Sequence, residues 1–146
     1  MFPSYIQNAI QAFARLPGIG VRQATRLVFY LLKENNENTD IFLQSIRAIK
    51  EKIHTCVLCF LYFEPITEEQ KICAICANPK RLKTMICVIE KEIDVEVIEK
   101  MNTFQGVYHV VGEAVDTLDI QKAIPVMRLI ERITYIKNQL PPPSIS

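Results

Sequence analysis

The segment CVLCFLYFEPITEEQKICAIC, residues 56–76, holds four of the five cysteines of this 146-residue chain. A Cys-x-x-Cys pair stands at each end of the segment, and thirteen residues separate the two pairs. Each pair can offer two thiolates to one side of a tetrahedral ion, and the residues between them are long enough to fold back as a hairpin. The spacing therefore predicts one zinc ion bound by Cys56, Cys59, Cys73 and Cys76.

Other roles for paired cysteines fit this spacing less well. A disulfide framework is disfavoured in a reducing cytosol, and a thioredoxin-type redox site needs one Cys-x-x-Cys pair rather than two. Four thiolates fill a tetrahedral coordination sphere, so the predicted zinc is structural and leaves no position for a catalytic water. We expect His54 to be a surface residue beside this site and Cys87, within the apolar run ICVIE, to be buried in the core.

The overall composition is typical of a soluble globular protein, with 49% hydrophobic and 23% charged residues. No apolar run reaches the roughly 18 to 20 residues that a membrane-spanning helix needs. The first residues, MFPSYIQNAIQAFARLPG, show no basic region ahead of the apolar part and no small-residue cleavage site, so we expect no secretory signal. The expected location is the cytoplasm, without a membrane partner.

A second informative segment is LPGIGVRQATRL, residues 16–27, which contains Gly18 and Gly20. We expect a helix before Pro17 and another over residues 21–33, joined by a tight turn. Glycine has no Cβ and tolerates positive φ, so the turn can bring its N–H groups close to a bulky ligand. Those groups lie at a helix N-terminus, where the helix dipole favours a phosphate.

Basic residues extend this predicted phosphate site. Arg22 and Arg26 are four positions apart and share a helix face, which Lys33 extends. Residues 1–33 contain four basic residues and no acidic one, although the net charge of the chain is only +1. The sequence therefore predicts contact with the DNA backbone, independent of base sequence, through Gly18, Gly20, Arg22, Arg26 and Lys33.

Other interpretations of the glycine pair remain open. A P-loop would need Gly-Lys-Ser or Gly-Lys-Thr, and a dinucleotide fingerprint would need a third glycine and a preceding strand. The simplest alternative is a Pro-Gly helix stop followed by solvated arginines.

The remaining elements follow from hydrophobic periodicity. Ser4 is expected to cap the first helix, and Thr39 or Asp40 a third helix ending near His54. Phe42, Ile46, Ile49 and Ile53 form the apolar stripe of that third helix. Apolar runs at 84–90 and 106–113 are typical of strands, and the helix expected over 94–101 between them predicts a βαβ unit with parallel strands. A last helix is expected over about 120–137.

We therefore expect an α+β chain built from several modules. The expected order is a DNA-binding helical module (1–54), a four-cysteine zinc module (55–80), an α/β module (81–140) and a disordered proline-rich tail (141–146).

Acidic residues follow the first expected strand of the α/β module. Glu90 ends that strand, where ligands bind in parallel sheets, and Asp94 opens the next helix. A magnesium site for phosphoryl transfer would need further carboxylates, yet the chain contains no Asp-x-Asp, and Asp116 and Asp119 are isolated. A solvated helix face is the alternative. His109, within VYHVVG, is expected to be a satisfied core histidine.

Taken in order, these features resemble the RecR family of bacterial recombination mediators. The resemblance rests on FARLPGIGVRQATRLVFYLL, similar to the family's helix-hairpin-helix, and on the four-cysteine module. It continues through ICVIEKEIDVEVIEK, which looks like the opening of a Toprim domain, and TFQGVYHVVGE. It covers residues 5–113 in register and extends more loosely to about 137.

The resemblance implies a non-catalytic DNA-repair protein of the RecFOR pathway. Such proteins form ring-like oligomers on DNA and act with RecO, and in some settings RecF, to load RecA onto single strands. Carried over to this chain, the basic hairpin positions fall on Arg22 and Arg26, the zinc ligands on the four paired cysteines, and the Toprim glutamate and aspartate on Glu90 and Asp94.

The sequence departs from the family pattern at two points. Glu113 stands where the family has a second glycine, and members of the family are longer than this 146-residue chain, with further strands and helices. A short variant, a fragment and a frame-shifted product all fit this difference, and oligomer formation stays open. Two alternative functions also remain: a magnesium-dependent Toprim phosphotransferase, like a primase or nuclease, and a zinc-stapled interaction domain without a DNA role.

Overall fold

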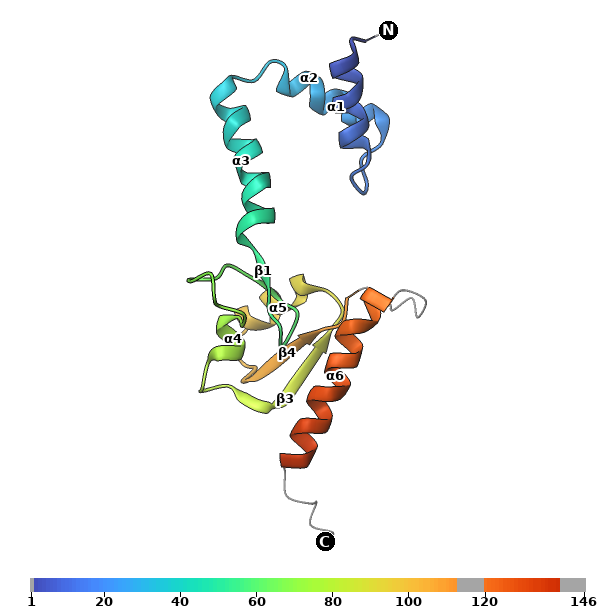
Figure 1. The fold of residues 1–146 in the computed structure, drawn as a ribbon. Helices are drawn as coiled ribbons and strands as arrows, with labels where there is room; N and C mark the ends of the chain where they lie inside the picture. The colour runs from blue at the N-terminus through green and yellow to red at the C-terminus, as the bar shows by residue number, and fades with distance from the viewer. Residues whose placement is uncertain (1, 113–119, 140–146) are drawn as a thin grey trace. The chain divides into compact units, whose positions relative to one another are not determined.

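The computed structural model of the chain describes residues 2–112 and 120–139 (Figure 1). The chain divides into two compact units, Met1–Glu51 and Lys52–Ser146, which we describe separately. N-terminal helices, a four-cysteine cluster and a small parallel sheet are all present, so the predicted fold class is confirmed. The division into modules at residues 54, 80 and 140 stays a prediction, and the expected tail at 141–146 lies outside the described residues.

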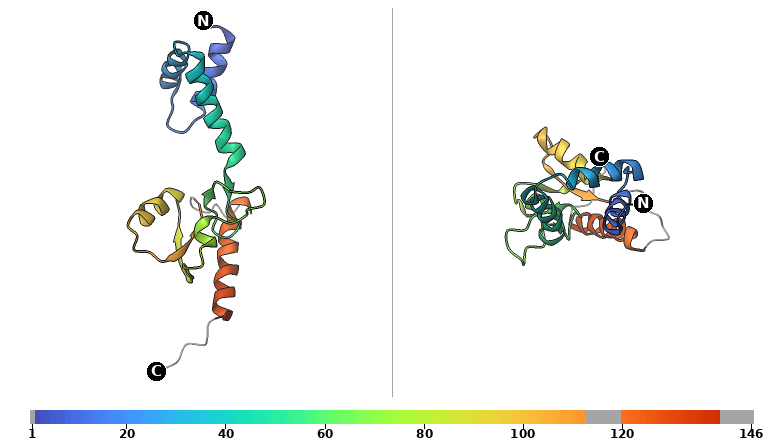
Figure 2. Two further views of the ribbon diagram at one scale, coloured as in Figure 1. Left: turned by 90° about the vertical axis from the view of Figure 1, so that its left-hand side faces the viewer. Right: turned by 90° about the horizontal axis from the view of Figure 1, so that it is seen from above.

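The first unit contains three helices: α1 (Ser4–Ala14), α2 (Val21–Leu31) and α3 (Asn36–Lys52). Helices α1 and α2 pack against each other around buried Ile10, Ala24 and Val28 (Figure 2). Ala24 is fully buried, and its small side chain lets the two helices approach closely. This pairing forms the helical hairpin that the LPGIG segment predicted.

The helix boundaries differ from the expected ones. Ser4 is the first residue of α1 rather than its cap, because Pro3, with φ of −54° and ψ of 150°, occupies the capping position. Helix α3 begins at Asn36, before Thr39 and Asp40, because the Asn35 Oδ1 accepts the Asn38 N–H at 2.8 Å. Helix α2 ends at Leu31, so Lys33 lies beyond it. The tract after α2 offers several capping side chains, and the sequence pattern alone did not single out the first.

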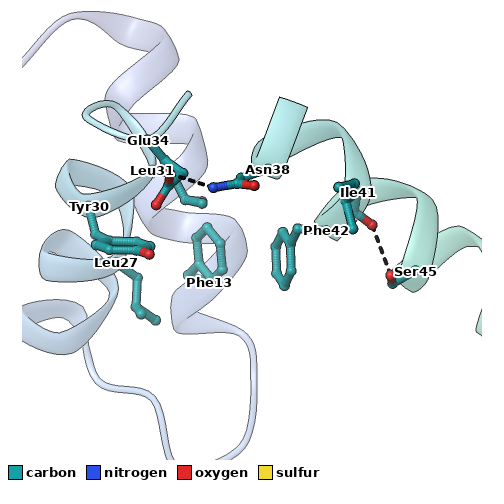
Figure 3. Close-up of a pocket in the computed structure, with 9 residues that line it drawn as sticks. All are labelled: Phe13, Leu27, Tyr30, Leu31, Glu34, Asn38, Ile41, Phe42 and Ser45. Atoms are coloured by element: carbon teal, nitrogen blue, oxygen red, sulfur yellow. Dashed lines mark hydrogen bonds between the residues drawn. The ribbon is translucent and has the colours of Figure 1, made fainter. Parts of the chain in front are cut away.

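The apolar stripe expected on α3 is present but exposed. Phe42 is 41% exposed and Ile49 is 62% exposed, and α3 has no buried residue. A cleft of about 530 Å³ separates the first part of α3 from the hairpin. Figure 3 shows Phe13 of α1 and Phe42 of α3 facing each other across it.

The second unit begins with a short antiparallel hairpin of β1 (His54–Thr55) and β2 (Tyr62–Phe63) and a single helical turn, α4 (Ala74–Ala77). Three elements follow in the order strand, helix, strand: β3 (Leu82–Ile89), α5 (Glu92–Lys100) and β4 (Gly106–Val110). Helix α6 (Ile120–Gln139) lies beside β4 (Figures 1 and 2).

Strands β3 and β4 are parallel, with Ile86 opposite Val107 and Ile89 opposite Val110, which confirms the predicted βαβ unit. All five residues of β4 are buried. Gly106 allows the strands to meet at the start of β4, because a Cβ there would lie only 2.5 Å from the Met85 carbonyl oxygen. The two strands are therefore in close contact at this end of the sheet.

The cysteine segment and the sheet share one hydrophobic core. Its buried members include the four paired cysteines together with Leu61, Ile89, Val95, Tyr108 and Val110. Cys87 packs against this core but is only partly buried, so the expectation of a buried Cys87 was too strong. The second unit therefore depends on the cysteine segment for its packing.

A polar network joins the loop before β3 to α5 and β4. The Arg81 guanidinium forms an ion pair with Glu99 and donates to the Phe104 carbonyl at 3.0 Å. The Tyr108 hydroxyl donates to the same carboxylate. Hydrogen bonds from Arg81, and then from Tyr108, hold the pKa of Glu99 below its usual value although partial burial opposes this.

Candidate metal centre and nucleic-acid interface

The four paired cysteines converge from the two turns that the spacing predicted. All four are buried, and their Sγ atoms lie within 4.8 Å of one another. The Cys59 and Cys73 sulfur atoms are 3.6 Å apart. Zinc–sulfur bonds of about 2.3 Å in a tetrahedron place the sulfurs roughly 3.8 Å apart, so this cluster has the size of a zinc site.

Local backbone structure orients each cysteine pair. In the first turn, the Phe60 N–H donates to the Cys56 carbonyl at 2.9 Å, and Phe60 itself takes the left-handed conformation with φ of 63°. In the second turn, Cys73 precedes α4, and its sulfur accepts the Cys76 N–H at 3.5 Å. The Cys73 N–H donates in turn to the Cys56 sulfur at 3.4 Å. Backbone donors directed at sulfur suit thiolates.

The electrostatics of the cluster fit a bound cation. Hydrogen bonding with Cys59, and then with Cys73 and Cys76, holds the pKa of Cys56 well below its usual value. The proximity of Cys56 conversely raises the pKa of Cys59. Without a cation the four thiols cannot all lose their protons together, whereas Zn²⁺ stabilises four thiolates at once. The residues therefore fit a structural zinc ion.

His54 is exposed in β1 and does not belong to the cluster, as expected. Within residues 2–112 and 120–139, these four cysteines form the only group of three or more potential metal ligands.

The hairpin between α1 and α2 has the backbone form expected of a phosphate site. Gly18 has a φ of +79°, which a residue with a side chain rarely adopts. Gly20 has a φ of −80° and caps α2 without any side-chain hydrogen bond. Among the described residues, no acceptor takes the N–H groups of Val21 and Arg22. Both glycines are exposed, and none of the described residues places a heavy atom within 4 Å of a Cβ built at either position, apart from the adjoining backbone.

Arg22 and Arg26 are exposed on α2, four residues apart. No ion pair within the described parts of the chain involves either guanidinium. Lys33 is also exposed, but it lies after the end of α2. The expectation that Lys33 extends the helix face of the two arginines was therefore wrong. Within the described part of the chain, α2 therefore carries backbone donors and two guanidinium groups without partners. Their role in DNA binding stays a prediction.

The two acidic positions of the α/β part stand apart from any metal cluster. Glu90 follows the last residue of β3, and Asp94 lies in the first turn of α5; both are exposed. The described residues place no third metal ligand beside them. Asp116, Asp119 and Glu113 lie outside those residues.

His109 is fully buried in β4, and only one of its two ring nitrogens has a hydrogen-bond partner among the described residues. Its Nε2 lies 2.8 Å from the Pro125 carbonyl oxygen of α6, and its Nδ1 has no partner among the described residues. Burial lowers the pKa of His109, which favours the neutral ring.

Sequence reasoning missed three basic residues that bond to backbone carbonyls around the core: Arg81, Lys83 and Arg132. Their partners are distant in sequence or are main-chain atoms, so no sequence motif predicts these contacts.

A membrane-spanning helix, which needs a long and continuously apolar segment, is not found among the described residues.

Comparison with known proteins identifies the family. A family model described as "RecR, helix-hairpin-helix" matches residues 6–50. A protein named Recombination protein RecR from Nocardia farcinica is 35% identical over 139 residues, which cover 95% of this chain and 66% of that protein.

Two further proteins of the same name agree. The one from Bifidobacterium adolescentis is 37% identical over 130 residues, covering 88% of this chain and 62% of its own length. The one from Magnetococcus marinus is 36% identical over 114 residues, covering 78% and 54%. The chain thus spans from about half to two thirds of the length of these curated relatives. On this similarity, and on the hairpin and cysteine cluster that accompany it, the chain belongs to the RecR family.

Proposed function

We propose that this chain is a DNA-binding recombination mediator that takes part in DNA repair without catalysing a reaction of its own. The observation that carries the proposal is the α1–α2 hairpin, in which Gly20 caps α2 without a side chain and Arg22 and Arg26 are exposed nearby. Such a site binds phosphate oxygens rather than base edges, so binding is independent of base sequence.

The cysteine cluster supports this function indirectly. We propose that Cys56, Cys59, Cys73 and Cys76 hold one zinc ion, which stabilises the second unit and supplies no catalytic chemistry. Lys33, Gly18 and Gly20 complete the proposed DNA site.

By similarity to its relatives, we propose that the chain acts in the cytoplasm with RecO-like and RecF-like proteins to load RecA. A ring-like homo-oligomer belongs to the same proposal, in which Glu90 and Asp94 serve as partner contacts. A magnesium-dependent phosphotransferase has less support, because the described residues bring no further metal ligand to Glu90 and Asp94.

Equilibrium binding of the purified chain to a labelled oligonucleotide tests the DNA role. We expect Arg22→Ala and Arg26→Ala each to weaken binding about five-fold near 0.15 M salt, since each removes one phosphate contact. Arg47→Ala is the matched control, because Arg47 is an exposed arginine on α3 of the same unit. Equal affinities for all four proteins would instead favour an interaction domain without a DNA role.

A further inference from the structure

The side chain of a lysine in β3 forms hydrogen bonds to the backbone of the second cysteine turn. The Lys83 ammonium donates to the carbonyl oxygens of Cys76 and Asn78, both at 2.7 Å, and approaches that of Ile75 at 3.5 Å. These carbonyls belong to α4 and to the residue that ends it, where helix carbonyls lack intrahelical partners. Lys83 therefore fixes the segment that carries Cys76.

An arginine of α6 holds the first cysteine turn in the same manner. The Arg132 guanidinium donates through Nη1 to the Leu58 carbonyl at 3.2 Å and to the Tyr108 carbonyl at 2.9 Å. Leu58 lies between Cys56 and Cys59, and Tyr108 lies in β4. Arg132 thus ties the turn between two ligands to the buried strand of the sheet.

The charge of these two residues suits the centre that they flank. Four thiolates around Zn²⁺ carry a net charge of about −2. Cations that bond to the backbone of the ligand turns offset this charge and also restrict the turns. Groups that orient metal ligands in this way typically change metal affinity by about 10- to 100-fold when they are removed.

We propose that Lys83 and Arg132 are positioning residues of the metal centre, each holding one Cys-x-x-Cys turn in the geometry that binds zinc. The proposal rests on the four cysteines binding zinc, as proposed above. It implies that β3 and α6, which contribute no ligand, contribute to metal retention.

Zinc transfer from the loaded chain to excess chromogenic chelator measures this retention. Elemental analysis of the wild-type chain comes first, because a chain without zinc refutes the metal centre itself rather than these two residues. We expect Lys83→Met and Arg132→Gln to release zinc about ten-fold faster or more. Lys83→Arg and Arg132→Lys, which keep charge and donors, should recover much of the wild-type rate.

Three control variants separate positioning from charge loss and from general instability. Lys80→Met and Arg128→Gln remove the same charge; Lys80 is exposed and Arg128 pairs only with Glu131 at the surface among the described residues. Val95→Ala weakens the core of the second unit without touching either cation. We expect the two charge controls to release zinc within two-fold of the wild-type rate. Val95→Ala, which weakens a core that contains the cysteines, should release zinc faster than wild type but more slowly than Lys83→Met and Arg132→Gln.

Two results overturn the proposal. The first is that Lys83→Met and Arg132→Gln release zinc no faster than the charge controls, Lys80→Met and Arg128→Gln. The other is equally fast release from Val95→Ala, which assigns the effect to loss of stability. If Lys83→Met does not fold, Lys83→Gln takes its place, because it keeps a donor and loses the charge. Its zinc-release rate is then compared with the rates of the same controls.

Discussion

Gly18 and Gly20 differ in backbone conformation although they stand one residue apart in the hairpin. Gly18 needs a positive φ of +79°, whereas Gly20 has the extended conformation of a helix cap, with φ of −80° and ψ of 166°. Neither is confined by neighbouring atoms. A side chain at Gly18 would therefore be strained by the backbone conformation, whereas a side chain at Gly20 would meet no obstacle among the described residues.

The same substitution should therefore affect stability differently at the two positions. We expect Gly18→Ser to lower the free energy of unfolding by about 1 kcal/mol, because a residue with a Cβ is strained in the left-handed region. Gly20→Ser should leave stability unchanged or raise it by a few tenths of a kcal/mol, since serine is a better helix cap than glycine. Denaturant unfolding followed by circular dichroism compares the two, and equal losses would contradict this difference.

Gly20→Ser should nevertheless weaken DNA binding. A capping hydroxyl would accept the N–H groups of the first turn of α2, which are the donors proposed for phosphate. We expect a several-fold loss of affinity in a chain that melts no earlier than wild type. Unchanged binding by a stable Gly20→Ser chain would remove these amides from the interface and leave only the arginines.

At the scale of elements, the sequence predicted the features that rest on a strong local pattern or on residue spacing. A Pro-Gly stop predicted the hairpin, two apolar runs with a helix between them predicted the βαβ unit, and the paired thiols predicted the cysteine cluster. The structure contains all three. The start of α3 did not follow, because Asn35 caps it ahead of the expected Thr39 or Asp40. Periodicity likewise could not show that the apolar stripe on α3 would remain exposed.

The network of Arg81, Glu99 and Tyr108 could not be predicted from the sequence either. Arg81 is 18 residues and Tyr108 is 9 residues from Glu99, and the three belong to different parts of the fold. We expect Glu99→Gln to destabilise the second unit by about 2 kcal/mol, since three hydrogen bonds to its carboxylate, two from Arg81 and one from Tyr108, are weakened or lost. Glu96→Gln is the matched control on α5. It breaks an ion pair with Lys100 that is exposed to solvent and therefore contributes little to stability. Thermal unfolding that ranks the two variants equally would contradict the structural role of Glu99.

At the scale of the whole molecule, the two units have separate cores. The core of the first unit consists of Ile10, Ala24 and Val28, and that of the second contains the four cysteines and the residues of the sheet. Loss of a metal from the cysteines should therefore act on one unit only.

Metal removal tests this separation. We expect a zinc chelator, or Cys73→Ser, to abolish hydrogen-exchange protection in β3, β4 and α5, because structural zinc binding is coupled to folding. Protection of α1 and α2 should persist, since their packing includes no cysteine. Simultaneous loss of protection in both units would show that they fold as one.

The salt dependence of DNA binding tests the central claim, that the hairpin contacts the phosphate backbone through Arg22 and Arg26. For duplex DNA, each phosphate contact contributes about 0.9 to the slope of log K against log salt concentration. We expect the slope for the chain carrying both Arg22→Ala and Arg26→Ala to be shallower than wild type by about 1.8, with the Arg47→Ala control unchanged. A slope identical to wild type would contradict the claim.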